Sequence, residues 1–378
     1  MPGKLFPIGG PVAEEDIVDR EDFIVSLTLR LAEGQSVMLY GPRRIGKTSL
    51  ACETLRRLKT KGFYVASVDF FRLTGKRDFA IALINACLEN RTGIRKTLDV
   101  WKDRTKTIIG TDKLAIKLQD LELDLGLSRG EQDDDALLDY ALGLPDVLAK
   151  RDKRPLVVLF DEFQDASRVA GTEIYKKMRS YFQNQKDVAY LFLGSKEGMI
   201  KTLFSDKREA FYRFATILPL PPIPAIAWVE YIAAKFRARG ILCPPEPINE
   251  AISKSGGHPQ DTMVVCSELY YALLEAGQDI ISLELVQLGY ERALLTLAPI
   301  YDEILDDLNL SFVGRQVLKR IATAAGIYSI AKANPNEIKR TIDHLLAKNI
   351  IEKTGRGSYT FVEPMFRDYL LREFFSGD

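Results

Sequence analysis

Residues 41–48 read Gly-Pro-Arg-Arg-Ile-Gly-Lys-Thr and match the pattern GxxxxGK(S/T) at every fixed position. An apolar run at residues 36–40 precedes them, and a helical pattern at residues 48–59 follows. Between a strand and a helix, the backbone N–H groups of such a loop and of the helix N-terminus face a polyphosphate. A chance glycine-rich turn is the alternative. The strand–loop–helix order favours a phosphate-binding loop.

Two side chains of this loop carry chemistry that a polyphosphate requires. Lys47 supplies a positive charge for the β- and γ-phosphate oxygens, and the Thr48 hydroxyl can ligate Mg²⁺. ATP or ADP together with Mg²⁺ is therefore the expected ligand. The residues of the loop expected to contact it are Gly41, Pro42, Arg43, Arg44, Ile45, Gly46, Lys47, Thr48 and Ser49.

An acidic pair, Asp161 and Glu162, follows the apolar run at residues 156–160. Ligands of open α/β sheets bind at the carboxyl ends of the strands, where this pair would lie. We expect Asp161 to join Thr48 in the metal shell, and Glu162 to act as general base for the attacking water while Lys47 holds the phosphate. A plain helix start is the alternative for such a pair, but its combination with the loop favours hydrolysis.

Further candidates follow two other strands. Gly194 and Ser195 follow the apolar run at residues 189–193, and Ser195 could contact the γ-phosphate or the water there; the alternative is an N-cap of the helix that follows. Arg208 and Arg213 precede a strand at residues 217–220. One of them, with Arg213 as the choice, could act on the nucleotide of a neighbouring subunit, or it could form an exposed ion pair.

The order of elements predicts three domains. Up to residue 221, strands alternate with helices, which indicates an α/β P-loop NTPase domain with a parallel sheet covered on both faces. Residues 222–299 show helical patterns alone and predict a lid domain. Residues 300–378 show helices followed by a two-stranded hairpin, which is the order of a winged helix.

Residues 112–128 depart from the alternation, because apolar side chains recur there at nearly every second position. Period two predicts an inserted β-hairpin. This hairpin could pack on the sheet, or it could offer a surface for a partner or a second copy of the chain.

Charge is balanced overall and unbalanced locally. The chain has 52 Lys and Arg against 52 Asp and Glu, which excludes a protein that coats nucleic acid or anionic membrane along its whole surface. Residues 308–360 carry nine basic and three acidic side chains. Double-stranded DNA is therefore a candidate partner, and protein docking is the alternative use of a winged helix. The expected DNA contacts are Lys339, Arg340, Lys353 and Arg356.

Cysteine usage and hydropathy bear on location. The four cysteines are far apart and form no CxxC, and no apolar run is long enough to span a bilayer. We expect a cytoplasmic protein with no membrane contact.

The chain as a whole resembles the archaeal-type ATPase family in the STAND branch of AAA+ proteins, relatives of the origin-recognition initiators. The resemblance rests on Val18-Asp19-Arg20-Glu21, the phosphate loop, Asp161-Glu162-Phe163-Gln164, Gly194-Ser195 and Gly256-Gly257-His258-Pro259. It implies that residues 11–20, with Arg20, border the adenine, and that the lid approaches the nucleotide through His258 and Pro259; for these two the alternative is a helix-start turn. The segment Glu363-Pro364-Met365-Phe366-Arg367 resembles the family's end motif, without the His that holds ADP in signalling members.

Together these features predict a Mg²⁺-dependent ATP-binding and ATP-hydrolysing switch whose nucleotide state repositions the winged helix for DNA binding. A second interpretation is a STAND-type signalling or defence ATPase that forms homo-oligomers and recruits a protein partner. A third is a nucleotide-binding scaffold with negligible turnover. The basic winged helix favours the first interpretation, and the apolar insertion favours the second.

Overall fold

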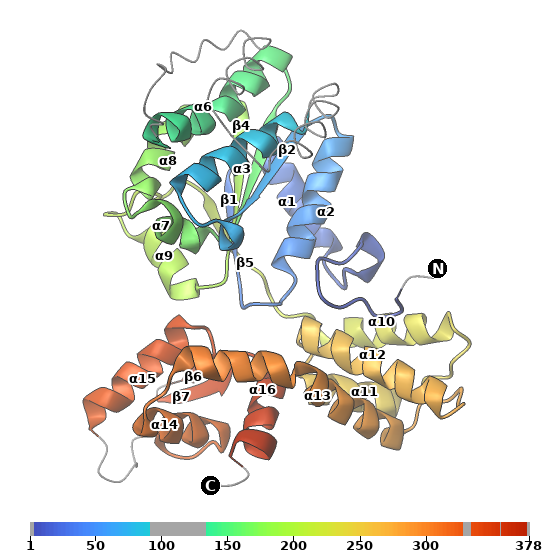
Figure 1. The fold of residues 1–378 in the computed structure, drawn as a ribbon. Helices are drawn as coiled ribbons and strands as arrows, with labels where there is room; N and C mark the ends of the chain where they lie inside the picture. Colours follow the sequence, from blue (N-terminus) through green and yellow to red (C-terminus); the bar gives the residue numbers. More distant parts are fainter. Residues whose placement is uncertain (1–3, 91–133, 328–333, 356, 376–378) are drawn as a thin grey trace, which may run out of the picture.

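The computed structural model describes residues 4–90, 134–327, 334–355 and 357–375. Figure 1 shows an α/β part, with a helical part and a C-terminal part lying beside each other beneath it. The predicted hairpin at 112–128 and Arg356 lie outside the described residues. So do residues 329–333, where one of the helices expected between residues 300 and 378 would fall.

Five parallel strands form the central sheet, in the spatial order β2-β3-β4-β1-β5. They are β1 (Val37–Tyr40), β2 (Tyr64–Asp69), β3 (Leu156–Asp161), β4 (Val188–Gly194) and β5 (Thr216–Pro219). Every residue of β4 and all but the last of β3 are buried, as expected of central strands covered on both faces. The predicted parallel sheet is therefore confirmed.

Successive side chains of each strand enter two separate cores. On one face, Val37 and Leu39 of β1 pack with apolar side chains of α1 and α2. On the other face, Met38 packs with those of α3, α6 and α8. The helices of this part are α1 (Glu21–Ala32), α2 (Lys47–Thr60), α3 (Lys76–Leu88), α6 (Asp134–Asp152), α7 (Ala166–Ala170), α8 (Ile174–Phe182) and α9 (Glu197–Ser205), with 3-10 turns at Glu14–Asp16, Phe70–Arg72 and Phe163–Asp165.

Four helices make up the helical part, in which the sequence predicted helices alone. They are α10 (Ala225–Arg237), α11 (Pro245–Ser255), α12 (Pro259–Glu275) and α13 (Leu283–Leu308). Helix α13 is longer than the pattern indicated, because it continues through Pro299. A proline inside a helix costs about 3 kcal/mol, and burial of Tyr301 and Leu308 in the next turns offsets that cost. The expected domain boundary at residues 299–300 thus lies within one continuous helix.

The C-terminal part has the element order of a winged helix. It comprises α14 (Phe312–Ala322), α15 (Pro335–Ala347), β6 (Ile351–Gly355), β7 (Ser358–Phe361), α16 (Pro364–Tyr369) and a π-helical turn (Leu370–Phe374). Asn334 caps α15, because its side chain accepts a hydrogen bond from the backbone N–H of Asn336. The hairpin was expected, whereas α16 was not.

One hydrophobic core joins the helical part to the C-terminal part. It contains side chains of α10 to α13 together with those of α14 to α16, including Trp228, Tyr301 and Phe366, and also Phe6 and Val18 of the N-terminal segment. The two cores that flank the sheet are separate from it. Lid and winged helix are therefore packed as one body. Among the described residues, no helix is both long and apolar enough to cross a membrane.

Candidate nucleotide site

The loop between β1 and α2 adopts a conformation that its sequence requires. Gly46 has φ +95°, in the left-handed region that favours glycine, and Arg44 also has a positive φ of 62°. Lys47 is buried, and its Nζ donates to the carbonyl oxygens of Gly41 (2.8 Å) and Pro42 (2.6 Å). Burial lowers the pKa of Lys47 to about 8, although the carboxylates of Glu162 and Asp161 oppose the shift. The loop thus holds a desolvated cation at the N-terminus of α2.

Oxygen ligands suited to Mg²⁺ meet beside this cation. Thr48 Oγ1 donates to Asp161 Oδ2 over 2.8 Å, which brings the first turn of α2 to the carboxyl end of β3. Burial raises the pKa of Asp161. A hydroxyl and a carboxylate are hard oxygen donors of the kind that Mg²⁺ prefers, so the two residues fit the metal.

A third polar residue at this edge was missed by sequence reasoning. Asp69 ends β2 and stands in register with Asp161 on the neighbouring strand β3. It lines the same cavity as Asp161. An acidic residue after an apolar strand was the signal that could have identified it.

The carboxylate of Glu162 is held by two neighbours. Ser195 Oγ donates to Glu162 Oε2 over 3.0 Å, and the side-chain amide of Gln164 donates to the same oxygen. Ser195 is 1% exposed, and the N-cap residue of α9 is Lys196, so the hydroxyl of Ser195 serves the carboxylate and does not cap that helix. No pattern in the sequence predicted this contact of Gln164.

A cavity of about 660 Å³ lies over the loop, within the volume range of small-molecule sites. Its walls are the N-terminal segment, the loop and α2, the ends of β2 and β3, and the start of α12. Arg20 and Pro259, expected as nucleotide contacts, both line it, and so do the apolar side chains of Val18, Trp228 and Met263. One end of the cavity is thus polar and cationic, and the other offers apolar surface suited to a base.

The lid touches the loop through one histidine. His258 Nε2 lies 3.2 Å from the carbonyl oxygen of Arg43, and His258 Nδ1 lies 3.4 Å from Asp261 Oδ1. Burial by itself lowers the pKa of His258, but the carboxylates of Asp261 and Glu363 and the carbonyl oxygen of Arg43 together outweigh burial and leave this pKa raised. His258 is also the N-cap residue of α12, so the helix-start turn and the contact with the loop coexist.

The winged helix touches the loop as well. Arg44 Nη1 forms an ion pair of 2.9 Å with Glu363 Oε2, at the N-terminus of α16. The Glu363 side chain is 12% exposed, and burial raises its pKa although Arg44 opposes the shift. The next residue, Pro364, packs against Gly256 at the end of α11. Loop, lid and winged helix therefore meet at one junction.

Other expected site residues lie apart from this junction. The described residues that line the cavity do not include Arg208 or Arg213. Arg208 pairs with Asp206 over 2.7 Å, and Arg213 is exposed with its guanidinium 5.2 Å from the centre of the Tyr212 ring. Their action on a neighbouring subunit stays a prediction.

The expected DNA contacts are on the surface of the C-terminal part. Lys339 and Arg340 are exposed on α15, whereas Ile338 and Ile342 of the same helix are buried, and Lys353 is exposed on β6.

A phosphate loop after β1, acidic residues at the ends of β2 and β3, and the strand order 2-3-4-1-5 define a P-loop NTPase fold of the AAA+ kind. Residues 17–261 match a family described as an ATPase domain predominantly from Archaea, so the chain belongs to that family. No curated protein matches the chain.

Solved structures are similar over nearly the whole length. The Walker-type ATPase PABY2304 of Pyrococcus abyssi is 19% identical with a TM-score of 0.71, covering 97% of this chain and 99% of its own. The ORC2 protein of Aeropyrum pernix, solved as ADPNP-ADP complexes, is 16% identical with a TM-score of 0.59 and coverages of 97% and 95%. Cdc6p of Pyrobaculum aerophilum is 11% identical with a TM-score of 0.50, covering 98% of each chain. At these identities, the likeness is one of fold.

Proposed function

We propose that this protein is a Mg²⁺-dependent ATP-hydrolysing switch, in which the nucleotide state sets the position of the lid and winged helix relative to the sheet. The observation that carries the proposal is the ion pair between Arg44 and Glu363, because it links the phosphate loop directly to the winged helix. The contact between His258 and the Arg43 carbonyl links the same loop to the lid.

The proposed chemistry divides between four groups. Lys47 holds the phosphate oxygens, and the backbone N–H groups of residues 43–49 surround them. Thr48 and Asp161 would hold Mg²⁺, which neutralises phosphate charge when bound. Glu162 accepts the proton of the attacking water, and Ser195 orients that carboxylate.

The adenine base of the nucleotide is proposed to lie at the end of the cavity away from Lys47, between Arg20 and Pro259. Arg20 is fixed there, since its guanidinium donates to the carbonyl oxygen of Pro221 over 2.6 Å. The N-terminal segment is joined to the loop by a hydrogen bond of 3.1 Å from the Val12 amide to Ser49 Oγ. A nucleotide would therefore contact both the sheet part and the lid.

The proposed movement of the lid and winged helix rests on the division of the molecule into separate hydrophobic cores. Lid and winged helix share one core, so they are proposed to move as one body against the sheet. The junction with the loop is polar and small by comparison. A change in the loop that displaces Arg44 removes a contact with the moving body, because Glu363 belongs to that body. A ligand shifts such an equilibrium through its differential contacts with the two states.

The proposed ATP binding and hydrolysis are tested with two variants. Lys47→Ala should lose nucleotide binding, and Glu162→Gln should bind ATP as tightly as the wild type while turnover falls by about 10²-fold or more. Steady-state ATPase rates and equilibrium binding of ATP measure the two effects. Wild-type turnover in Glu162→Gln would refute the assigned base, and a wild-type protein that binds ATP without turnover would support the scaffold interpretation.

The proposed movement of the lid and winged helix between nucleotide states is tested by small-angle X-ray scattering. ADP-bound wild type and ATP-bound Glu162→Gln should give different radii of gyration. In the Glu363→Gln background that difference should shrink, because the loop no longer contacts the winged helix through a charge pair. Identical scattering curves for the two nucleotide states would overturn the switch.

We propose double-stranded DNA as the partner of the winged helix, through Lys339, Arg340, Lys353 and Arg356. The exposure of the first three, on a helix and a hairpin of one small unit, supports it. Phosphate contacts make affinity fall with salt. Binding of a duplex should therefore weaken steeply between low and physiological salt, and the salt slope should be smaller in Lys339→Ala/Arg340→Ala.

A matched control for that experiment is Lys59→Ala/Lys61→Ala, which removes two exposed lysines at the end of α2. This variant should bind DNA as the wild type does. No binding at low salt, with ATP or with ADP, would rule out the DNA partner.

A protein partner or a homo-oligomer is the second candidate. Three exposed apolar side chains of the helical part support it: Leu242 (62% exposed), its bridge partner Ile280 (48%) and Leu283 (41%). Light scattering of Glu162→Gln with ATP should then show a larger species that Leu242→Asp abolishes. In such an assembly Arg213 is the proposed residue acting on the neighbour's nucleotide.

We also propose that the protein is located in the cytoplasm, since its four cysteines are free thiols.

A further inference from the structure

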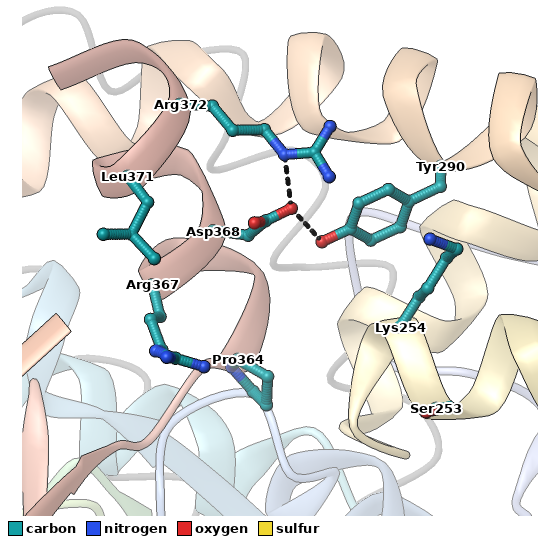
Figure 2. Close-up of a pocket in the computed structure, with 8 residues that line it drawn as sticks. All are labelled: Ser253, Lys254, Tyr290, Pro364, Arg367, Asp368, Leu371 and Arg372. Carbon is teal, nitrogen blue, oxygen red and sulfur yellow. Dashed lines mark hydrogen bonds and ion pairs between the residues drawn. The ribbon is translucent and has the colours of Figure 1, made fainter. Parts of the chain in front are cut away.

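A second pocket, of about 280 Å³, lies where the helical part meets the C-terminal part. Figure 2 shows its lining, with Lys254 and Tyr290 on the helical side and Arg367, Asp368 and Arg372 on the winged-helix side. The lining residues of this pocket and those of the nucleotide cavity do not overlap. It is a separate site on the molecule.

Cations outnumber acids in this lining, with three cationic side chains and one carboxylate. Asp368 accepts from the Tyr290 hydroxyl over 2.8 Å and pairs with Arg372 Nε over 2.8 Å. Outside the lining, Glu250 lies 3.4 Å from Lys254 Nζ and is 44% exposed. Solvent screening weakens such a pair, so positive charge remains in excess.

Two of the cationic side chains, Lys254 and Arg372, lie against the same aromatic ring, that of Tyr290. Lys254 Nζ lies 5.0 Å and the Arg372 guanidinium 5.6 Å from the centre of the Tyr290 ring. That ring belongs to a residue only 3% exposed. Cations over an aromatic ring are attracted to its face. The two charges, one from each part of the molecule, therefore converge on one fixed ring.

Arg367 adds a guanidinium whose N–H donors are largely unused by its contacts within the protein. Its Nε donates to the carbonyl oxygen of Ala322 over 2.7 Å, which fixes the direction of the side chain. Within the described part of the chain, this is the one polar contact of that guanidinium. A guanidinium has five N–H donors in a planar fork that matches phosphate oxygens.

We propose that this pocket binds a small phosphate anion of the inorganic phosphate or pyrophosphate class. The volume is just below the range of sites for drug-sized ligands, so the occupant is small. Arginine and lysine are the side chains that phosphate groups prefer. An anion bound there contacts Lys254 at the end of α11 together with Arg367 and Arg372, and so ties the helical part to the C-terminal segment.

The test is a calorimetric titration of pyrophosphate into the full chain carrying Lys47→Ala. That substitution weakens the competing phosphate loop, and Mg²⁺ is left out because pyrophosphate binds it in solution. One saturable site is expected at constant ionic strength. Adding Lys254→Met or Arg367→Gln should weaken its affinity at least tenfold, whereas adding Arg292→Gln, a cation of α13 paired with Glu275 outside the pocket, should leave it unchanged.

Circular dichroism confirms that each variant is folded, and Lys254→Arg, which keeps the charge, should retain binding. A short DNA duplex, titrated in parallel, identifies the source of the phosphate. Absence of saturable pyrophosphate binding overturns the proposal, as does unchanged affinity in Lys254→Met. An effect of Lys254→Met confined to duplex binding would assign the pocket to nucleic-acid phosphate and overturn it as well.

Discussion

Ser195 Oγ donates a 3.0 Å hydrogen bond to Glu162 Oε2, joining the tips of two neighbouring strands, β4 and β3. The backbone of Glu162 has φ 48°, a left-handed conformation that is uncommon outside glycine. The side chain proposed as general base is thus fixed both by its own backbone and by a hydroxyl from the next strand.

Loss of that hydroxyl should therefore affect the rate more than binding. We expect Ser195→Ala to lower kcat for ATP roughly tenfold, because misorientation of a catalytic base forfeits part of its contribution. KM should change less than twofold. Ser195→Thr, which keeps a hydroxyl, should retain most of the activity. Steady-state kinetics measures both parameters, and an unchanged kcat in Ser195→Ala would show that the contact has no role in turnover.

Nucleotide affinity should depend on pH through Lys47. Burial lowers its pKa to about 8, so the charge that attracts phosphate is present below that pH and is lost above it. The affinity for ADP should fall as pH rises from 7.5 to 9.5, by about tenfold for each pH unit above 8. Adenosine, which has no phosphate, is the control and should bind equally at both ends. A flat profile for ADP would contradict the role of this ammonium.

The stability of the ligand-free protein should change with pH in the opposite sense, and should rise as pH rises. The unfolded chain holds the Lys47 proton more tightly than the folded chain does, since the folded pKa is the lower one. This residue's contribution to the free energy of unfolding therefore rises between pH 8 and 10.5, the ordinary pKa of a lysine side chain.

Two glycines offer a matched test of the junction between α11 and α16. Gly256 and Gly277 have almost the same φ, +61° and +63°, but an added Cβ would lie 2.5 Å from Pro364 Cγ at Gly256 and would meet nothing within 4 Å at Gly277. Gly277→Ala should cost about 1 kcal/mol from backbone strain alone. Gly256→Ala should cost about 1–3 kcal/mol more. Urea unfolding measures both, and equal costs would mean that Pro364 yields freely.

The ion pair between Arg44 and Glu363 can be measured by a double-mutant cycle. With Arg44→Met and Glu363→Gln, unfolding free energies without nucleotide should give a coupling of about 1 kcal/mol, since the side chains are 26% and 12% exposed. The more exposed pair of Arg292 and Glu275, at 33% and 61%, should couple by less than about 0.5 kcal/mol. Additive effects of the two substitutions at the junction would mean that the contact contributes nothing.

Local patterns in the sequence predicted the sheet and the loop correctly. The apolar runs that became β1, β3 and β4 are short and bounded by turn residues, so periodicity and punctuation were enough. Residues 41–48 could be assigned because backbone amides and one lysine make up most of a phosphate site. Contacts within a few residues decide such features.

Contacts across long separations could not be read in this way. Ser195 against Glu162, Asp69 beside Asp161, and Glu363 against Arg44, a residue 319 positions earlier, depend on which elements the fold brings together. Helix α13 passes the expected boundary because packing offsets the cost of Pro299.

The sequence by itself determined a phosphate loop, an acidic pair after a buried strand, and a C-terminal unit with a local positive charge, because each is a property of adjacent residues. Only the tertiary structure decided that lid and winged helix share one core and that both touch the loop. Burial and charge pairing act between surfaces that meet after folding, and the order of residues along a chain does not specify which surfaces those are.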